Sequence, residues 1–341
     1  MKNRKLLLVG SSESVHLENY FHLIQDYFDE ILVVSNSKVT YAESKILNFS
    51  LKKPWLLIGK VIKMKKILKD FEPSHIHVHQ AGTYSYITAL ANKSRIPLYL
   101  TTWGSDVLLT PKKNFLYKHL VKFSLQKADF ITADAQFMVD AIKQMVDTNV
   151  LIANFGIDYL KVEIPSKEKI IYCNRLHKSL YRVDSIIEGF CQFYAENPDW
   201  KLVIGANGVE TDKLKELART LLPESSYEFI GFVSQEENKK QYLRAKMWIS
   251  YPVSDGTAIS LLEAMGYGCI PVVSDLPANR EWIEDQSNGV IISKTIKHAL
   301  NSAKLLDNEL VTKKNQEIIE SKATKEVNRK KFVTLYDQKS R

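Results

Sequence analysis

Short apolar runs alternate with helix-length amphipathic stretches along almost the whole chain, and no other feature constrains its fold so strongly. Most of the runs are continuously apolar, as expected for parallel strands that are covered on both faces. Helices between parallel strands form βαβ units, so the pattern predicts α/β domains with doubly wound sheets. The predicted strands are Leu6–Gly10, Ile31–Ser35, Ile76–His79, Leu98–Thr102, Phe130–Ala133, Val150–Asn154, Ile170–Cys173, Lys201–Ile204, Glu228–Ile230, Trp248–Ser250, Ile270–Val273 and Val290–Ile292.

A polar, proline-containing segment at Gly156–Lys169 follows one of these strands and is the predicted domain boundary. Six predicted strands fall on each side of it, so the 341 residues are expected to form two domains, at residues 1–160 and 161–314. The last segment, residues 315–341, is polar and charged with few core positions. We expect it to form a helix that packs across the surface and returns to the first domain.

The cysteines and the net charge indicate in which compartment the protein works and which classes of partner it binds. The three cysteines have no paired spacing, which argues against a disulfide framework or a zinc site and fits a reducing cytoplasm. No apolar run approaches the length of a bilayer span, so we expect a cytoplasmic protein, either soluble or peripheral on the inner face of the membrane. The net charge of +8 favours anionic partners, namely nucleic acid, anionic lipid or phosphate-bearing substrates.

The segment Tyr251–Asp275 carries the strongest chemical signal. It follows an apolar strand and opens a helix near Ala258, so Asp255, Gly256 and Thr257 are expected at a helix N-terminus. Unpaired backbone N–H groups and the helix dipole favour a phosphate at such a position. The missing side chain of Gly256 lets the backbone approach a ligand closely.

Two carboxylates mark the same segment, because Asp255 and Glu263 lie eight residues apart, two helical turns along it. Asp255 could accept hydrogen bonds from sugar hydroxyls. Glu263 could hold both hydroxyls of a ribose, as an acidic residue does in dinucleotide sites. Taken alone, the commoner interpretation is structural, with Asp255 as an N-cap and Glu263 as a solvated helix residue.

The carboxylates also belong to a longer pattern, Asp255-x7-Glu263-Ala264-Met265 followed by Gly-Cys-Ile-Pro-Val-Val at 268–273. This pattern resembles the retaining glycosyltransferases of family 4 (glycosyl transferases group 1), whose first acidic residue is usually Glu. The resemblance implies a GT-B fold, in which two Rossmann-like doubly wound domains face each other across a cleft. The acceptor side is then N-terminal and the nucleotide-sugar side C-terminal. Other matching blocks are Asn154–Asp158, Cys173–Leu176, Glu228–Val233, Glu281 and Asn288-Gly289.

The resemblance assigns the donor diphosphate to positive side chains after the first strand of the second domain. The planar guanidinium of Arg175 suits bidentate phosphate contacts, and a lysine adds a point charge. The spacing departs from the family here: Lys178 is the predicted lysine, and Arg182 is the competing candidate. Asp255, Arg175 and Lys178 are the predicted catalytic residues. The predicted donor contacts are Gly10, Ser11, Arg175, Lys178, Gly231, Phe232, Gly256, Thr257, Ala258 and Glu263.

The reaction implied is transfer of a glycosyl group from a nucleotide sugar, with UDP as the family's usual nucleotide, to an acceptor hydroxyl with retention at the anomeric carbon. Arg175, Lys178 and the helix N-terminus near Thr257 would stabilise the leaving phosphate. No divalent metal and no cofactor are therefore expected, in keeping with the absence of an Asp-x-Asp motif from the sequence. No covalent enzyme intermediate is implied, and the leaving phosphate itself can take the acceptor's proton.

The first domain carries a weaker signal. Gly10-Ser11 follows the first strand, where relatives often have a glycine-rich loop near the donor. A later turn resembles the family's His-Gly-x-Asp turn, with Trp103 in place of the histidine. Trp103 either stacks on a sugar ring or packs in a partly buried position. Asp106 in the same turn either contacts the acceptor or holds the turn.

Histidines supply two more candidate contacts. His75, His77 and His79 alternate along one strand and point to one face, but no further ligand has metal-site spacing, so no metal is expected there. His79 lies nearest the carboxyl end of the strand and could reach the cleft. His16, which follows the first loop, is the second candidate for a sugar or acceptor contact.

The segment Lys52–Phe71 is the sharpest charge feature, with Trp55 at its start and apolar positions at helical spacing. Such a basic amphipathic helix can lie on an anionic membrane surface. It can also pack on a sheet with a solvated lysine face, which is the commoner case between strands. The lysines of that predicted face are Lys60, Lys63, Lys66 and Lys69.

Three other functions remain open from the sequence. A sugar-nucleotide epimerase of the same fold is an alternative, although the carboxylate pattern weakly disfavours it. A phosphorylase would need a lysine for pyridoxal phosphate, and the sequence shows no recognisable candidate. Nucleic-acid binding is disfavoured, because the lysines cluster on one amphipathic helix instead of interleaving with aromatics. The expected partners are thus a nucleotide sugar, a glycan or lipid-linked acceptor of bacterial surface polysaccharide or glycoconjugate synthesis, and an anionic membrane.

Overall fold

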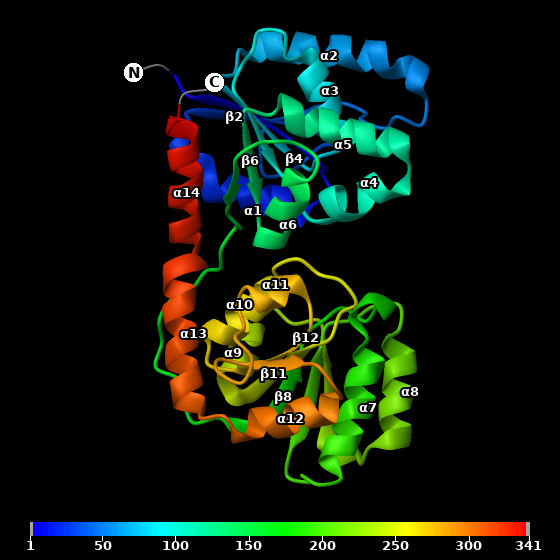
Figure 1. Ribbon diagram of the computed structural model, residues 1–341, viewed down its shortest axis with the longest axis vertical. Helices are drawn as coiled ribbons and strands as arrows, with labels where there is room; N and C mark the ends of the chain where they lie inside the picture. The colour runs from blue at the N-terminus through cyan, green and yellow to red at the C-terminus, as the bar shows by residue number, and fades with distance from the viewer. Residues whose placement is uncertain (1–2, 339–341) are drawn as a thin grey trace. The chain divides into compact units, whose positions relative to one another are not determined.

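The computed structural model describes residues 3–338 and divides the chain into two compact units. Unit 1 comprises Met1–Phe155 and Lys325–Arg341, and unit 2 comprises Gly156–Thr324 (Figure 1). Residues 1, 2 and 339–341, which the predicted first domain and C-terminal segment include, lie outside the described residues. Among residues 3–338, no helix has the length and apolar character needed to span a membrane.

Unit 1 is built on a seven-stranded sheet in the spatial order β3-β2-β1-β4-β5-β6-β7, with every neighbouring pair parallel. The order reverses between β1 and β4, which makes this pair the topological switch point. The strands are β1 (Lys5–Val9), β2 (Glu30–Ser35), β3 (Ser44–Ile46), β4 (His75–His79), β5 (Leu98–Thr101), β6 (Phe130–Ala133) and β7 (Val150–Ile152).

Helices cover both faces of this sheet, which explains the continuously apolar strands. Leu7 and Val9 pack in one core with α2, α3, α5 and α6, whereas Leu6 and Leu8 pack in a second core with α1 and α14 (Figure 1). The helices are α1 (Val15–Ile24), α2 (Leu57–Phe71), α3 (Thr83–Ala91), α4 (Thr110–Lys113), α5 (Phe115–Lys127), α6 (Gln136–Lys143) and α14 (Lys325–Asp337).

Unit 2 repeats the architecture with six parallel strands in the order β10-β9-β8-β11-β12-β13, so its switch point lies between β8 and β11. The strands are β8 (Glu168–Cys173), β9 (Lys201–Gly205), β10 (Tyr227–Gly231), β11 (Ala245–Ser250), β12 (Ile270–Ser274) and β13 (Val290–Ile292). The helices are α7 (Val183–Tyr194), α8 (Thr211–Leu221), α9 (Gln235–Arg244), α10 (Ile259–Gly266), α11 (Pro277–Arg280), α12 (Ile296–Leu305) and α13 (Asn308–Lys322).

The α/β prediction is confirmed strand by strand. All twelve predicted strands are present, with ends that differ from the prediction by at most three residues. The prediction missed β3, because this edge strand has three residues, none of them buried, and no apolar run marks it.

The C-terminal segment differs from the single helix predicted at residues 315–341. The structure has two helices there: α13 belongs to unit 2 and α14 to unit 1, so the chain changes unit at Gly156 and again at Lys325 rather than at residues 160 and 315. The break after Lys322 has a local cause. The Ile157 N–H donates to the Ala323 carbonyl over 2.8 Å, and Ile157 pairs with Thr324 in a parallel bridge, so the backbone there leaves the helical path.

Buried polar side chains join α14 to the rest of unit 1. The Tyr20 hydroxyl lies 2.7 Å from the Tyr336 hydroxyl and 3.0 Å from Nδ1 of His77, and Tyr336 also contacts that nitrogen. Nε2 of His77 lies 2.8 Å from the Thr101 hydroxyl. These groups are buried, so their mutual hydrogen bonds offset the loss of water.

Candidate active site

The carboxyl edges of the two sheets carry the side chains singled out in the sequence. In open α/β sheets, ligands bind outside the carboxyl ends of the strands at the switch point. In unit 2 this places the segments after β8 and β11 at the expected site, and in unit 1 the segments after β1 and β4.

Arg175 and Asp255 form an ion pair across the switch point of unit 2, with 2.5 Å between Nη2 and Oδ2. Nη1 of Arg175 donates to the Ser260 hydroxyl over 3.0 Å, and its guanidinium carbon lies 4.4 Å from the centre of the Tyr181 ring. Arg175 is only 8% exposed, so its charge is fixed in place and shielded from water. Asp255 is not the N-cap of α10: that position is Ala258.

The two candidate cations after Arg175 have different surroundings. Nε and Nη2 of Arg182 donate to the carbonyls of Tyr251 and Pro252 over 2.9 and 3.2 Å, and its guanidinium carbon lies 3.7 Å from the Tyr251 ring centre. Arg182 therefore holds the segment that leads to Asp255. Lys178 is exposed at the carboxyl edge, so its ammonium group is the better placed of the two to meet a phosphate.

Glu263 lies on α10 and ends a chain of buried hydrogen bonds. Its Oε2 accepts from the Tyr242 hydroxyl over 3.0 Å, and that hydroxyl accepts from Nδ2 of Asn174 over 2.7 Å. Nε1 of Trp248 donates to Oδ1 of Asn174 over 2.9 Å. Burial raises the pKa of the Glu263 carboxyl and Asp158 adds to the rise, while the bond from Tyr242 opposes it. Glu263 is thus an oriented, partly buried carboxyl, not a solvated helix residue.

Sequence analysis missed Tyr242 and did not assign a role to Asn174. Tyr242 lies on α9, 21 residues before the carboxylate it contacts, and no motif surrounds it. Asn174 lies in the Cys173–Leu176 block that matches the family, directly before Arg175. That position is a signal that Asn174 could orient neighbouring site residues. Only the packing of α9 against β8 and β11 shows that these residues meet.

The segment before α10 brings Gly256 and Thr257 to the same edge. The Gly256 N–H lies 3.1 Å from Oδ1 of Asp255, and Nε1 of Trp282 donates to the Thr257 hydroxyl over 3.3 Å. The carbonyl of Ala258 accepts from the first turn of α10, at the Leu261 N–H over 3.0 Å. These contacts place the three residues where the helix N-terminus was predicted.

Gly231 ends β10 and Phe232 follows it, two strands from β8 at the same edge. Gly231 has a φ of +70°, a conformation that favours glycine, and its carbonyl accepts from the Ala206 N–H over 2.6 Å. The turn leaves the Phe232 ring 82% exposed. An exposed aromatic ring at this edge offers a stacking surface to a planar base.

In unit 1, four aromatic side chains lie together near the ends of β1, β4 and β5. The ring of His16 lies 5.1 Å from that of Trp103 and 5.7 Å from that of Phe155, and the ring of His79 lies 5.6 Å from that of Trp103. His79 is buried, and neither of its ring nitrogens has a hydrogen-bond partner among residues 3–338; the same holds for Nε1 of Trp103. Burial, with further effects of His77 and His16, holds the pKa of His79 well below its usual range, so the ring is neutral.

Asp106 is buried and bound to backbone. Its carboxylate accepts from the N–H groups of Ala81, Trp103 and Val107 over 2.6, 2.9 and 3.1 Å. Burial raises the pKa of Asp106, and these donors oppose the rise. This geometry fits the second sequence interpretation, in which Asp106 holds the turn that carries Trp103.

Gly10 and Ser11 have local structural roles at the end of β1. A Cβ on Gly10 would lie 2.8 Å from Cδ1 of Leu17, so a side chain at this position would displace the Leu17 side chain of α1. The Ser11 hydroxyl accepts from the Glu13 N–H over 3.4 Å. Both residues lie at the switch point of unit 1. A Cβ placed on Gly10 would also lie 3.4 Å from Cβ of His79.

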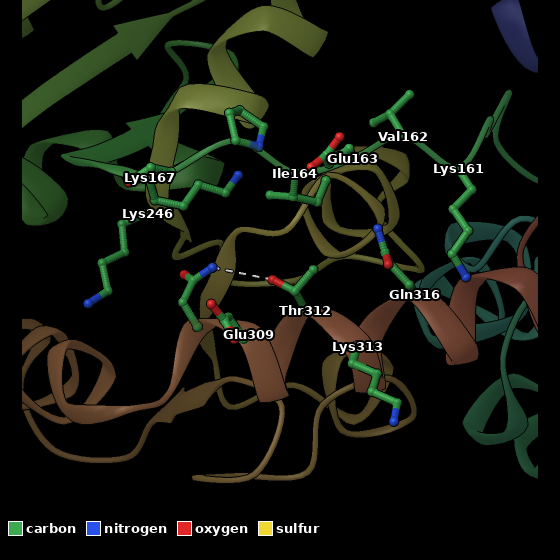
Figure 2. Close-up of a pocket in the computed structure, with 13 residues that line it drawn as sticks. Lys161, Val162, Glu163, Ile164, Lys167, Lys246, Glu309, Thr312, Lys313 and Gln316 are labelled. Atoms are coloured by element: carbon green, nitrogen blue, oxygen red, sulfur yellow. Dashed lines mark hydrogen bonds between the residues drawn. The ribbon is translucent and has the colours of Figure 1, made fainter.

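Residues 3–338 contain no group of three or more His, Cys, Asp or Glu side chains placed to hold a metal ion. A pocket of about 900 Å³ lies away from the motif residues, at the amino ends of β8 and β11, beside Lys167 and Lys246 (Figure 2). The ammonium group of Lys167 donates to the carbonyls of Tyr242 and Tyr267 over 2.7 Å each. Lys167 therefore supports the fold, and the pocket is separate from the carboxyl-edge site.

Comparisons with known proteins agree with this architecture. The family model of glycosyl transferases group 1 matches residues 161–325, and that of glycosyl transferase 4-like proteins matches residues 5–135. An alpha-monoglucosyldiacylglycerol synthase of Streptococcus pneumoniae is 22% identical over 258 residues, which are 67% of this chain and 58% of that protein. The chain spans between a quarter and three fifths of the length of the curated relatives it matches.

Two solved structures are similar over nearly their whole length. Anabaena HepE in complex with UDP has a TM-score of 0.80 at 14% identity, covering 97% of this chain and 99% of HepE. A glycosyltransferase of Rickettsia africae has a TM-score of 0.81 at 13% identity, covering 98% of each chain. At these identities the similarity shows the GT-B fold.

Proposed function

Since the chain belongs to the GT-B glycosyltransferases related to family 4, we propose that it transfers a sugar from a UDP-sugar to a hydroxyl of a glycan or lipid-linked acceptor. The proposed setting is bacterial surface polysaccharide or glycoconjugate synthesis at the cytoplasmic side. The choice of UDP is supported by the family pattern and by HepE, which was crystallised with UDP and with UDP-glucose.

The observation that carries the proposal is the ion pair of Arg175 and Asp255 at the switch point of unit 2. A diphosphate needs fixed positive charge, and a buried guanidinium held by a carboxylate and by Ser260 is already oriented. We propose that Arg175, Lys178 and the N-terminus of α10 stabilise the leaving phosphate. Asp255 then faces the sugar, and Glu263, oriented by Tyr242, binds the ribose hydroxyls.

Retention at the anomeric carbon and independence from divalent metal are parts of the same proposal. Retention is supported by the carboxylate pattern of the family. The positive groups named above could balance the charge of the departing diphosphate, and that is the argument for a reaction without a metal. In unit 1, we propose that His16, His79 and Trp103 contact the sugar or the acceptor, and that the Lys52–Phe71 segment contacts an anionic membrane.

The first test is thermal stabilisation by UDP, GDP, ADP and CMP in EDTA, for the wild type and for Glu263→Ala. A ligand at a hundred times its dissociation constant adds about 2.7 kcal/mol to the free energy of unfolding. We expect a shift with UDP that Glu263→Ala removes, while Glu284→Ala, an exposed control, keeps it. No shift with any nucleotide would refute the donor site.

Product analysis tests the reaction itself. With UDP-sugar and acceptor, we expect a product whose anomeric configuration equals that of the donor, measured by NMR, at a rate that EDTA leaves unchanged. A new UDP-sugar formed without acceptor would instead indicate an epimerase. An inverted product or a rate restored only by added magnesium would contradict the corresponding part of the proposal.

A further inference from the structure

Two exposed basic segments lie on the same face of unit 1. We call Lys52–Lys69 the α2 segment and Leu109–Lys127 the α4–α5 segment. Both α2 and α5 pack against α3 and contribute to the same hydrophobic core. The two segments therefore flank α3 on one face of the sheet (Figure 1).

The α2 segment exposes an apolar stripe. Trp55, Ile58 and Ile62, spaced by three and four residues, are 72%, 73% and 59% exposed, while Met64 and Leu68 pack inward. The sequence prediction put Lys60 on the lysine face, and that is wrong: Lys60 is buried over the sheet and its ammonium group donates to the Ser50 carbonyl. The exposed lysines of the segment are Lys52, Lys53, Lys63, Lys65, Lys66 and Lys69.

The α4–α5 segment, to which sequence analysis gave no role, has the same chemistry. Residues 112–119 form a continuous exposed run, in which the Phe115 and Leu116 side chains are 84% and 71% exposed. Five lysines and no acidic residue occur between Val107 and Lys127. Large exposed side chains next to one another, surrounded by a single sign of charge, indicate a contact surface.

Chain direction places the apolar parts of both segments at one edge. Helix α2 ends four residues before β4 begins, and α5 ends three residues before β6 begins, so both helices finish at the amino edge of the sheet. Their first turns, which carry Ile58 and Phe115, therefore lie toward the carboxyl edge. That is the edge at which His79 and Trp103 meet in this unit.

We propose that the α2 and α4–α5 segments form one bipartite docking surface for an anionic lipid bilayer. Trp55, Ile58, Phe115 and Leu116 enter the interface, and the exposed lysines lie at the level of the lipid headgroups. The proposal deepens the proposed function and rests on it in one respect: a lipid-linked acceptor would be presented directly beside the carboxyl edge of unit 1.

Charge and shape favour a bilayer over other occupants. A second copy of this surface would place lysines against lysines, which is repulsive. Nucleic acid would satisfy the lysines but would leave the aliphatic stripe of Ile58, Ile62 and Leu116 exposed, whereas a bilayer interface satisfies both.

Vesicle binding by charge-reversal variants tests the bipartite surface. Lys63→Glu with Lys66→Glu alters the α2 segment, and Lys112→Glu with Lys113→Glu alters the α4–α5 segment. The matched control is Lys93→Glu with Arg95→Glu, an equal charge change on exposed residues between α3 and β5, at the amino edge. We expect each test pair to weaken binding to phosphatidylglycerol–phosphatidylcholine vesicles at least about thirtyfold, since each lysine near the surface contributes roughly fivefold. The control should bind like the wild type.

Tryptophan emission tests insertion at each segment separately. Of the five tryptophans, all within residues 3–338, Trp55 is the exposed one. We expect its emission to shift to the blue on anionic vesicles and to be quenched by brominated lipid. Phe115→Trp in a Trp55→Phe background should respond in the same way. If the Phe115→Trp protein binds vesicles without a change in emission, the α4–α5 segment does not insert and the bipartite proposal is overturned.

The remaining outcomes are also decisive. If only the Lys63→Glu, Lys66→Glu protein loses vesicle binding, the α4–α5 segment takes no part and the bipartite proposal is overturned. If the wild type binds pure phosphatidylcholine vesicles equally well, the lysines do not contribute to binding. Self-association without vesicle binding, or salt-sensitive binding of random DNA in place of vesicles, would overturn the proposal in favour of another partner. The UDP thermal shift should be unchanged in all pairs. An unchanged UDP thermal shift shows that the variants are folded. It also distinguishes a wrong docking surface, which alters vesicle binding alone, from a wrong donor site, which gives no UDP shift in any protein.

Discussion

The two sheets share one strand order around their switch points, yet the side chains at the two carboxyl edges differ in kind. Unit 2 places the ion pair of Arg175 and Asp255 there, with Glu263 held by a hydrogen bond. Unit 1 places the rings of His79 and Trp103 there, and the Asp106 carboxylate in the same turn as Trp103 is bound to backbone. Topology thus fixes where a site can form, and the residues after each strand decide its chemistry, which is ionic at the edge of unit 2 and aromatic at the edge of unit 1.

The buried polar groups behind the two edges differ in a second way. Behind the edge of unit 1, His77 is hydrogen-bonded to Tyr20 and Thr101, and its ring can take up a proton in acid. Behind the edge of unit 2, Asn174 connects Trp248 to Tyr242, and none of these groups gains a charge in acid. The same fold therefore has one edge supported by a network that gains a charge in acid, and another supported by neutral groups that end at the Glu263 carboxyl, which loses its charge in acid.

Removing the guanidinium of unit 2 is expected to have the largest effect. Arg175→Ala should lower kcat/KM by about 10²- to 10³-fold, because it deletes a fixed donor to the leaving phosphate and leaves the Asp255 carboxylate without its partner. Arg175→Lys, which keeps the charge and loses the planar fork, should recover part of the rate. Steady-state kinetics with UDP-sugar measure both. If Lys178→Ala costs more than Arg175→Ala, the ranking of the two cations is wrong.

Acid should open unit 1 before unit 2. Burial lowers the pKa of His77 to about 3 from the ordinary value of 6.5, so the unfolded chain binds the proton more tightly. Stability from this group is therefore present above pH 6.5 and declines as the pH falls toward 3. Between pH 7 and pH 4.5 the loss is roughly 2 to 3 kcal/mol. Hydrogen exchange, corrected for the intrinsic rate, should show β4 and α14 losing protection before β8 and β11.

A variant checks that His77 causes this order. His77→Gln should show a smaller loss of protection between pH 7 and pH 4.5 than the wild type, even if its stability at pH 7 is lower. The burial that raises the pKa of the Glu263 carboxyl acts in the opposite direction in unit 2, since a raised carboxyl pKa favours the folded state in acid. Earlier opening of β8 and β11 would contradict the comparison.

The hydroxyl that orients Glu263 should have a smaller effect on donor binding. Tyr242→Phe removes one hydrogen bond to the carboxylate, and a bond to a charged group contributes about 1.5 kcal/mol, so the donor KM should rise about tenfold with kcat nearly unchanged. Tyr172→Phe is the control, because it removes a buried hydroxyl that contacts Asn238 and not Glu263. Equal kinetics for the two variants would show that Tyr242 has only a packing role.

Local sequence patterns mark the edge of unit 2 more clearly than that of unit 1 for a physical reason. Asp255 and Glu263 lie in one contiguous motif whose spacing directly reflects a strand, a turn and a helix. The ring cluster of unit 1 is assembled from segments more than sixty residues apart, such as His16 and His79, and no local pattern shows that they meet. Strand β3, with no apolar run, was missed for the same lack of a local signal.

Contacts between distant residues were the part that sequence could not supply. It left Lys178 and Arg182 as competitors, and it gave no sign that Arg182 donates to the carbonyls of Tyr251 and Pro252. It placed Lys60 on an exposed face because helical spacing alone does not show which side of a basic helix lies over the sheet. The carboxylates and the strands were predictable; their hydrogen-bond partners were not.

The smallest expected effect lies at the aromatic edge. If Trp103 contacts the sugar or acceptor through its ring face, Trp103→Phe should raise the acceptor KM less than about threefold, since an aromatic contact contributes about 0.5 to 1.5 kcal/mol and the ring is kept. Trp103→Leu should raise it further, while the UDP thermal shift stays unchanged in both because the proposed contacts to the diphosphate and the ribose lie in unit 2. A Trp103→Leu variant with wild-type acceptor KM and lowered Tm would show that Trp103 packs against His16 and His79 without touching substrate. The aromatic side chains of unit 1 would then have a structural role only, and the proposed substrate contacts would be limited to the carboxyl edge of unit 2.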